Sequence, residues 1–229
     1  MATLSPSTRF WSILLLVCVG LLGVLMLHPT SSTPTTFSTS TIPVKGVPTP
    51  HPTPIRMLQP FTGVQRLNQG DPAQYASLQQ YATWWPSTCS AAVMTEALNA
   101  YGHAYRIADV LGVEASLQHP TVITANDGLL YPGGLDRTLH TFGFQATPLP
   151  HSTLSQLEQD AHAEPIIVNF PPSTWAGGHF LMISGGDSSH VTLVDSSRLN
   201  IPSMSVSTFL SYWRGLAFVV TPSGQVVTR

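Results

Sequence analysis

Cys89 is the residue in this sequence with the clearest chemical potential. The 229-residue chain has two cysteines, and the other, Cys18, lies in an apolar stretch near the N-terminus. Apolar positions after Cys89 recur at helical spacing up to Gly102, which predicts a helix over 89–101. Unpaired N–H groups and the positive end of the dipole at a helix start favour a reactive thiolate. A small buried hydrophobic residue would also suit this position, and the spacing alone leaves both interpretations open.

A thiolate nucleophile needs a base, and His179 is the best candidate. It follows Gly177 and Gly178 and opens a predicted strand, while Asp195 ends the next predicted strand. Two neighbouring antiparallel strands would bring the two side chains together, so that the carboxylate orients the imidazole. Either residue alone would more often be structural, as we expect of His190. The order of cysteine, glycine-histidine and aspartate predicts a nucleophile, a base and an orienting group.

Helices precede strands in the part of the chain that carries these residues. Hydrophobic periodicity predicts helices over 89–101, 106–113, 134–142 and 152–162. Short β-rich runs then predict strands over 165–170, 179–185, 190–196 and 216–222, with a short helix over 206–213. This order predicts an α+β fold in which N-terminal helices pack on a C-terminal antiparallel sheet.

Several stretches taken together resemble one family, the papain-like cysteine peptidases related to the double-glycine leader peptidases of bacteriocin export (family C thirty-nine). The resemblance covers roughly residues 70–222, and it rests on the order and spacing of its motifs. The stretches that carry it are CSAAVMTEALNAYG (89–102), GLDRTLHTFGF (134–144), GGHFLMISG (177–185), VTLVDS (191–196) and FLSYWRGLAFVVTP (209–222). The resemblance implies a papain-like fold and a triad of Cys89, His179 and Asp195.

The sequence departs from the family pattern at two places near the nucleophile. The family usually has Cys-Gly-Pro, whereas Ser90 and Ala91 follow Cys89 here. The family also places a glutamine several residues before the cysteine, where its amide helps to hold the developing oxyanion. Thr83 occupies the position six before Cys89, so Gln80 is our candidate for this role, with a surface residue as the alternative.

The first sixty residues differ in composition from the rest of the chain. Residues 1–27 contain an apolar run from Trp11 to Leu27 after the single charged residue Arg9, which predicts a membrane anchor or signal segment. Residues 28–64 are rich in Thr, Ser and Pro, as in a stalk, and residues 65–229 form the predicted peptidase domain. These features predict a single-pass cell-membrane protein with its domain on the extracytoplasmic side, or a secreted one if the segment is cleaved.

Composition and motifs exclude other classes of function. Lys45 is the only lysine and the formal net charge is -2, so no basic patch exists for nucleic acid. The nine histidines include no zinc-binding spacing, and we expect neither a metal nor a cofactor.

The sequence therefore predicts a cysteine peptidase, or a related acyl-transferring hydrolase, that acts on a peptide or protein. Two alternatives stay open. The chain could be a non-catalytic surface binding module that keeps the papain-like fold, as the two departures near Cys89 would allow. An inert stalked structural protein is the other alternative, but it leaves a single cysteine at a helix start without a role.

Overall fold

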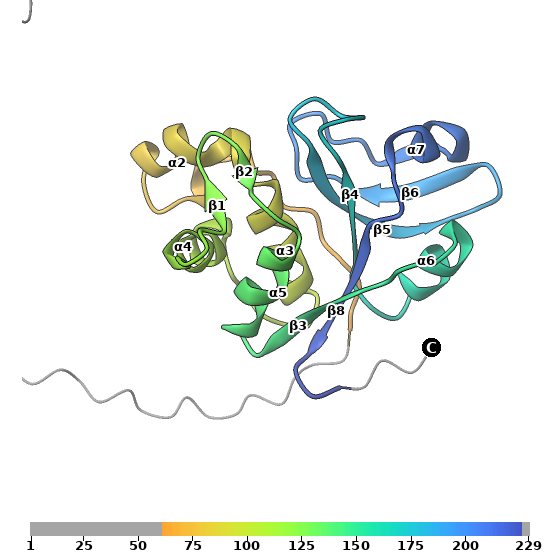
Figure 1. Ribbon diagram of the computed structural model, residues 1–229, viewed down its shortest axis with the longest axis horizontal. Helices are drawn as coiled ribbons and strands as arrows, with labels where there is room; N and C mark the ends of the chain where they lie inside the picture. Colours follow the sequence, from red (N-terminus) through yellow and green to blue (C-terminus); the bar gives the residue numbers. More distant parts are fainter. Residues whose placement is uncertain (1–60, 226–229) are drawn as a thin grey trace, which may run out of the picture. The chain divides into compact units, whose positions relative to one another are not determined.

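The computed structural model describes residues 61–225, and its helices come mainly before its strands (Figure 1). The first half contains η1 (Pro72–Gln74), α2 (Leu78–Trp84), η2 (Trp85–Ser87), α3 (Cys89–Asn99), α4 (Ile107–Ser116), β1 (Ile123–Thr124), β2 (Gly128–Leu129) and α5 (Gly133–His140). The second half contains β3 (Phe144–Pro148), α6 (Leu154–Asp160), β4 (Ile166–Phe170), β5 (His179–Gly186), β6 (His190–Val194), β7 (Ser203–Ser205), α7 (Val206–Tyr212) and β8 (Ala217–Pro222).

The larger sheet is antiparallel throughout, with the strand order β3-β8-β4-β5-β6-β7. Its strands alternate in the face to which their side chains point, as expected for a period of two. Ile167, Phe180, Met182 and Val194 pack on the side of α3, α4 and α5. Ile166, Val168, Leu181 and Ile183 pack on the opposite side, with α6 and α7. The sheet therefore separates two hydrophobic cores.

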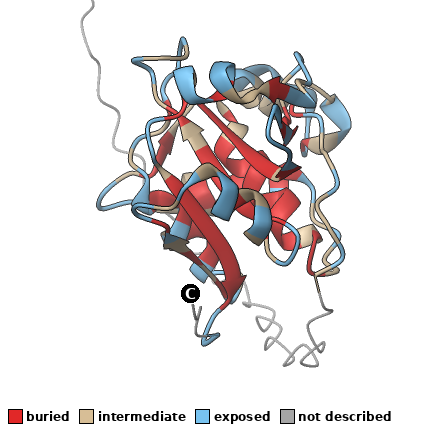
Figure 2. Cartoon of the chain, turned by 90° about the vertical axis from the view of Figure 1, so that its right-hand side faces the viewer, coloured by how far each residue is buried: buried red, intermediate tan, exposed pale blue. Residues whose placement is uncertain are grey.

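Helix α3 lies at the centre of the first core. All nine residues from Ser90 to Leu98 are buried, and the buried segments of helix and sheet face each other in Figure 2. A helix that is buried on all sides needs small and apolar residues, which the repeated alanines of α3 supply. Because interiors are packed as densely as organic crystals, the start of α3 has little freedom to move.

The α+β class and the papain-like arrangement of helices on an antiparallel sheet are confirmed. The predicted helix over 89–101 is shorter by two residues, and the predicted strands agree closely with β4, β5, β6 and β8. Strands β3 and β7, at the two edges of the sheet, were not predicted. Edge strands are short and half-exposed, so they lack the continuous apolar run that identifies a central strand.

The predicted membrane-anchored localisation requires correction. In residues 61–225 no helix is long and apolar enough to cross a membrane. The longest helix here, α3, has 11 residues, whereas a span needs about 20. The apolar segment 11–27 and most of the predicted stalk lie outside the described residues.

Candidate active site

Cys89 is the first residue of α3 and is partly exposed. Thr88, which precedes it, is fully buried, and the helix behind it is buried as well. A residue at this helical position has no carbonyl of its own helix to receive its N–H, so the amide is free for another acceptor. The fold thus holds the thiol on the rigid, buried start of a helix, next to backbone N–H groups.

His179 is the first residue of β5, and the loop before it directs the imidazole. Gly177 and Gly178 have φ values of +81° and +72°, a conformation that residues with a Cβ rarely adopt. A Cβ on Gly178 would also lie 3.2 Å from the Pro172 ring. Trp175 stacks on the imidazole, with ring centroids 5.8 Å apart. The loop therefore needs glycine both for its backbone conformation and for its close approach to Pro172.

Asp195 follows β6 directly and binds His179 from the neighbouring strand. The His179 Nε2 to Asp195 Oδ1 distance is 2.8 Å, and the two residues are 7% and 1% exposed. Asp195 Oδ1 also accepts from the Ser197 N–H, and Oδ2 accepts from the Ile201 N–H and the Ser197 hydroxyl. Burial raises the pKa of Asp195, but hydrogen bonds from His179, Ile201 and Ser197 outweigh it and hold this pKa below its usual range.

Cys89 is the second side chain that acts on the imidazole of His179. Asp195 occupies Nε2, which leaves Nδ1 as the ring nitrogen for the Cys89 hydrogen bond. Burial lowers the pKa of His179, but its hydrogen bonds and electrostatic interactions with Asp195 and Cys89 outweigh this effect and raise the pKa to about 9. The histidine therefore holds its proton at neutral pH, which suits an ion pair with a thiolate.

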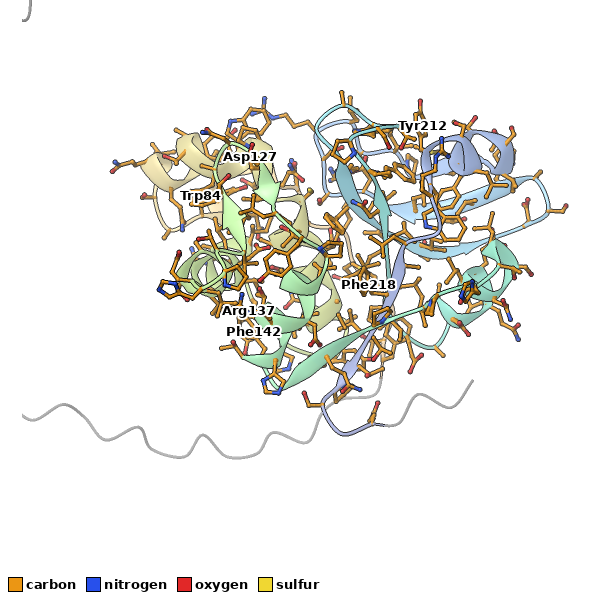
Figure 3. The ribbon with its side chains drawn as sticks, in the orientation of Figure 1. Trp84, Asp127, Arg137, Phe142, Tyr212 and Phe218 are labelled. Atoms are coloured by element: carbon orange, nitrogen blue, oxygen red, sulfur yellow. The ribbon has the colours of Figure 1, made fainter. Side chains whose placement is uncertain are left out.

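Cys89 and His179 line a cleft of about 420 Å³ between the helical part and the sheet, and Asp195 is buried behind His179. The helical side contributes Cys89 and the β1–β2 hairpin, and the sheet side contributes His179, the glycine loop and Asn169. In Figure 3, Asp127 lies on the hairpin of the helical side and Tyr212 on the sheet side. Leu129, Leu130, Tyr131, Pro172 and Phe180 provide apolar and aromatic surface along the cleft. A cleft of this size, with Cys89 in its lining, can hold a ligand that places one bond beside the thiol.

The structure does not bring Gln80 to this cleft. Gln80 lies in α2, and its Oε1 accepts the Ala76 N–H at 2.7 Å near the start of its own helix. Local capping therefore occupies the side chain that we expected at the oxyanion. His190 is exposed and bonds to Ser189, away from the cleft.

Sequence reasoning missed the hairpin β1–β2, the stacking of Trp175 and the role of Asn169. Asn169 lines the cleft, and its Nδ2 donates to the His179 carbonyl oxygen at 3.3 Å. The position of Trp175, four residues before His179 in a glycine-containing loop, was the one local signal for these contacts. The hairpin has two-residue strands, which are too short to give a periodic pattern.

The fold is that of papain-like peptidase domains of family C thirty-nine, as the sequence resemblance predicted. Two solved structures illustrate the likeness. The peptidase domain of ComA from Streptococcus, a bifunctional ABC transporter in a quorum-sensing pathway, matches with 20% identity and a TM-score of 0.50, covering 60% of this chain and 93% of that domain. A C thirty-nine-like peptidase from Bacillus anthracis matches with 12% identity and a TM-score of 0.50, covering 73% of this chain and 99% of that one. No protein-family model and no curated protein sequence matches.

Proposed function

We propose that this protein is a cysteine peptidase, or a related acyl-transferring hydrolase, with Cys89 as nucleophile, His179 as base and Asp195 as orienting group. The observation that carries the proposal is the placement of a thiol and a buried His–Asp pair on opposite sides of one cleft. The papain-like fold supports it, because this fold places a helix-start cysteine opposite a strand histidine. The mixture of apolar, aromatic and polar residues along the cleft supports a peptide substrate.

The reaction would proceed in two acyl-transfer steps. The Cys89 thiolate attacks the peptide carbonyl carbon, a C–S bond forms, and the His179 imidazolium gives its proton to the leaving amine as the C–N bond breaks. The neutral imidazole then takes a proton from water, whose oxygen attacks the thioester carbonyl carbon. The C–S bond breaks, the carboxylic acid leaves, and the Cys89 thiolate and the His179 imidazolium are restored. The Cys89 backbone N–H is the available donor to each oxyanion. Asp195 holds the imidazole in the required orientation throughout.

A non-catalytic peptide-binding module is the second candidate, and one specific observation favours it. The residues that line the cleft include no glutamine, and Gln80 is held by its own helix. Loss of one oxyanion donor costs roughly 10²–10³ in turnover in other hydrolases. A cleft that lacks this oxyanion donor would still bind a peptide.

The two candidates differ in the fate of a peptide, so the test uses a peptide mixture of proteolytic origin and mass spectrometry of the products. We expect the wild-type protein to cleave a subset of the peptides and to lose this activity when Cys89 is alkylated by iodoacetamide. Cys89→Ala and His179→Ala should abolish cleavage, whereas Asp195→Asn should retain a trace of it. The control His190→Ala should cleave like wild type.

The binding-module candidate predicts a different pattern. The wild-type protein would then retain peptides without cleaving any, and Cys89→Ala would retain them equally well. Cleavage that persists in Cys89→Ala would contradict the proposed nucleophile.

A further inference from the structure

The segment 66–69, which we call the bridging segment, contacts the strand end that carries Asp195. Three consecutive backbone carbonyls there each accept a hydrogen bond from it. Arg66 Nε donates to the Asp195 oxygen at 2.5 Å, and Arg66 Nη2 donates to the Ser197 oxygen at 2.6 Å. The Gln69 N–H donates to the Ser196 oxygen at 2.9 Å. The backbone around the orienting carboxylate is therefore held from a segment about 130 residues earlier in the chain.

The same segment also contacts the helix that carries Cys89. The Leu67 N–H donates to Glu96 Oε1 at 2.7 Å, and Glu96 lies in α3, two turns after Cys89. Glu96 is fully buried, and its second carboxyl oxygen has no hydrogen-bond partner. Burial raises the pKa of Glu96 well above its ordinary value. Because Glu96 is buried inside α3, the Leu67 N–H to Glu96 hydrogen bond holds segment 66–69 at a fixed place on this helix.

The side chain of Gln69 connects the backbone beside Asp195 with the turn before Cys89. Its Oε1 accepts from the Ser196 hydroxyl at 3.0 Å, and Ser196 is the residue directly after Asp195. Its Nε2 donates to the Trp85 oxygen at 3.1 Å, in the turn that leads into α3. The Gln69 carbonyl oxygen accepts from the Tyr75 hydroxyl, which also bonds to Thr88, the residue directly before Cys89. Gln69 is 6% exposed, so these bonds are shielded from water.

We propose that Gln69 is a positioning residue that sets the distance between the Cys89 thiol and the His179–Asp195 pair. The inference rests on the proposed function and adds to it a residue that touches none of the reacting atoms. A hydrophobic residue of the same size could fill the space but could not bridge a hydroxyl and a carbonyl oxygen. Both a donor and an acceptor are required, and a glutamine amide supplies both. Misplacement of a catalytic group by about 1 Å from a remote change can cost roughly a hundredfold in rate.

The test compares Gln69→Leu and Ser196→Ala with the control Gln79→Leu, which changes an exposed glutamine on α2. Two readouts are measured as a function of pH. One is the rate at which iodoacetamide alkylates Cys89, and the other is the titration of His179 followed by NMR of ¹⁵N-histidine-labelled protein. The melting temperature is recorded for each variant. Ser196→Ala removes a single hydrogen bond, so it keeps the test open if Gln69→Leu does not fold.

We expect Gln69→Leu to slow alkylation at pH 7 by roughly tenfold or more. It should also move the His179 titration to lower pH, because a displaced Asp195 stabilises the imidazolium less. Ser196→Ala should show a smaller change of the same sign, and Gln79→Leu none. A lower melting temperature with both pH profiles unchanged would overturn the inference and leave Gln69 with a structural role alone. A wild-type Cys89 that resists alkylation would contradict the proposed function instead, and the His179 titration would still decide the role of Gln69.

Discussion

His179 and Asp195 each stabilise the charged form of the other in a place where water cannot. Their side chains are almost fully buried, so an unpaired charge on either would be costly. The backbone N–H groups of Ser197 and Ile201 also donate hydrogen bonds to the Asp195 carboxylate oxygens. The pair is therefore one point at which pH should affect the stability of this fold.

The His179 proton predicts a specific pH dependence of stability. Its pKa rises from 6.5 to about 9 on folding, so its stabilising effect is fully present below pH 6.5 and is lost as the pH rises through 9. Relative to His179→Gln, the wild-type protein should lose on the order of 3 kcal/mol of unfolding free energy across this window. Urea unfolding at a series of pH values measures the difference. Parallel curves for the two proteins would contradict the assignment, and His190→Gln should parallel wild type.

Glu114 gives a second pH prediction, next to Cys89. It is fully buried on α4 and accepts from the Ser90 hydroxyl at 2.8 Å, and its other oxygen has no hydrogen-bond partner. Burial raises its pKa from 4.5 to about 8, so the folded state is favoured below pH 4.5 and this advantage is lost as the pH rises through 8.

Glu114→Gln removes the titration while keeping the size of the side chain. Across this window the variant should gain on the order of 5 kcal/mol of unfolding free energy relative to wild type. The measurement is chemical denaturation from pH 4 to pH 9. A constant difference over that range would show that Glu114 does not take up a proton on folding.

At the scale of elements, one helix start and one strand start carry the proposed nucleophile and base, and each is rigid for a different reason. Helix α3 is held by burial on all sides. Strand β5 is central in the sheet, with β4 and β6 as its neighbours, and its first residue is fixed by the glycine loop before it. The loop is therefore the element in which a small change should move His179.

Gly177 and Gly178 form a matched pair for testing this loop. Both have positive φ, so alanine at either should cost about 1–2 kcal/mol in backbone strain. Only Gly178→Ala also brings a methyl group against Pro172, whereas the space around Gly177 is open. We expect Gly178→Ala to slow Cys89 alkylation roughly tenfold and Gly177→Ala to slow it less. Equal rates in the two variants, measured with iodoacetamide, would contradict the role of the Pro172 contact.

At the scale of the whole molecule, the proposed function makes the cleft between the helical part and the sheet the place where a peptide is selected. Its lining combines apolar and aromatic residues with polar ones, and it includes one carboxylate, Asp127, with no lysine or arginine. Within residues 61–225 the His179–Asp195 contact is the single ion pair, so Asp127 has no cationic partner there. Asp127 Oδ2 accepts from the Thr124 hydroxyl, which leaves Oδ1 for a ligand.

This charge predicts a preference for peptides with a lysine or arginine near the scissile bond. Asp127→Asn should raise KM for such a peptide about two- to fivefold, which corresponds to an exposed ion pair worth up to about 1 kcal/mol. The kcat should stay unchanged, and a matched peptide with norleucine in place of lysine should bind both proteins equally. The same increase in KM for both peptides would contradict an electrostatic role of Asp127.

The sequence by itself determined the class of fold, the helix that begins at Cys89 and the strand that begins at His179. Each of these depends on a local pattern, such as helical spacing, glycine before a strand or an apolar β-rich run. Such patterns can be recognised within about ten residues. It also indicated the order in which the thiol, the imidazole and the carboxylate appear along the chain.

Only the tertiary structure decided which glutamine lies near the site. Gln80 is closer to Cys89 in sequence, but its side chain caps its own helix through Ala76. Gln69 lies 127 residues from Ser196 and meets it through a contact that no local pattern encodes. The edge strands and the cleft depend on long-range packing in the same way. A residue's local pattern specifies its element, whereas its neighbours across the core are set by how all the elements pack at once.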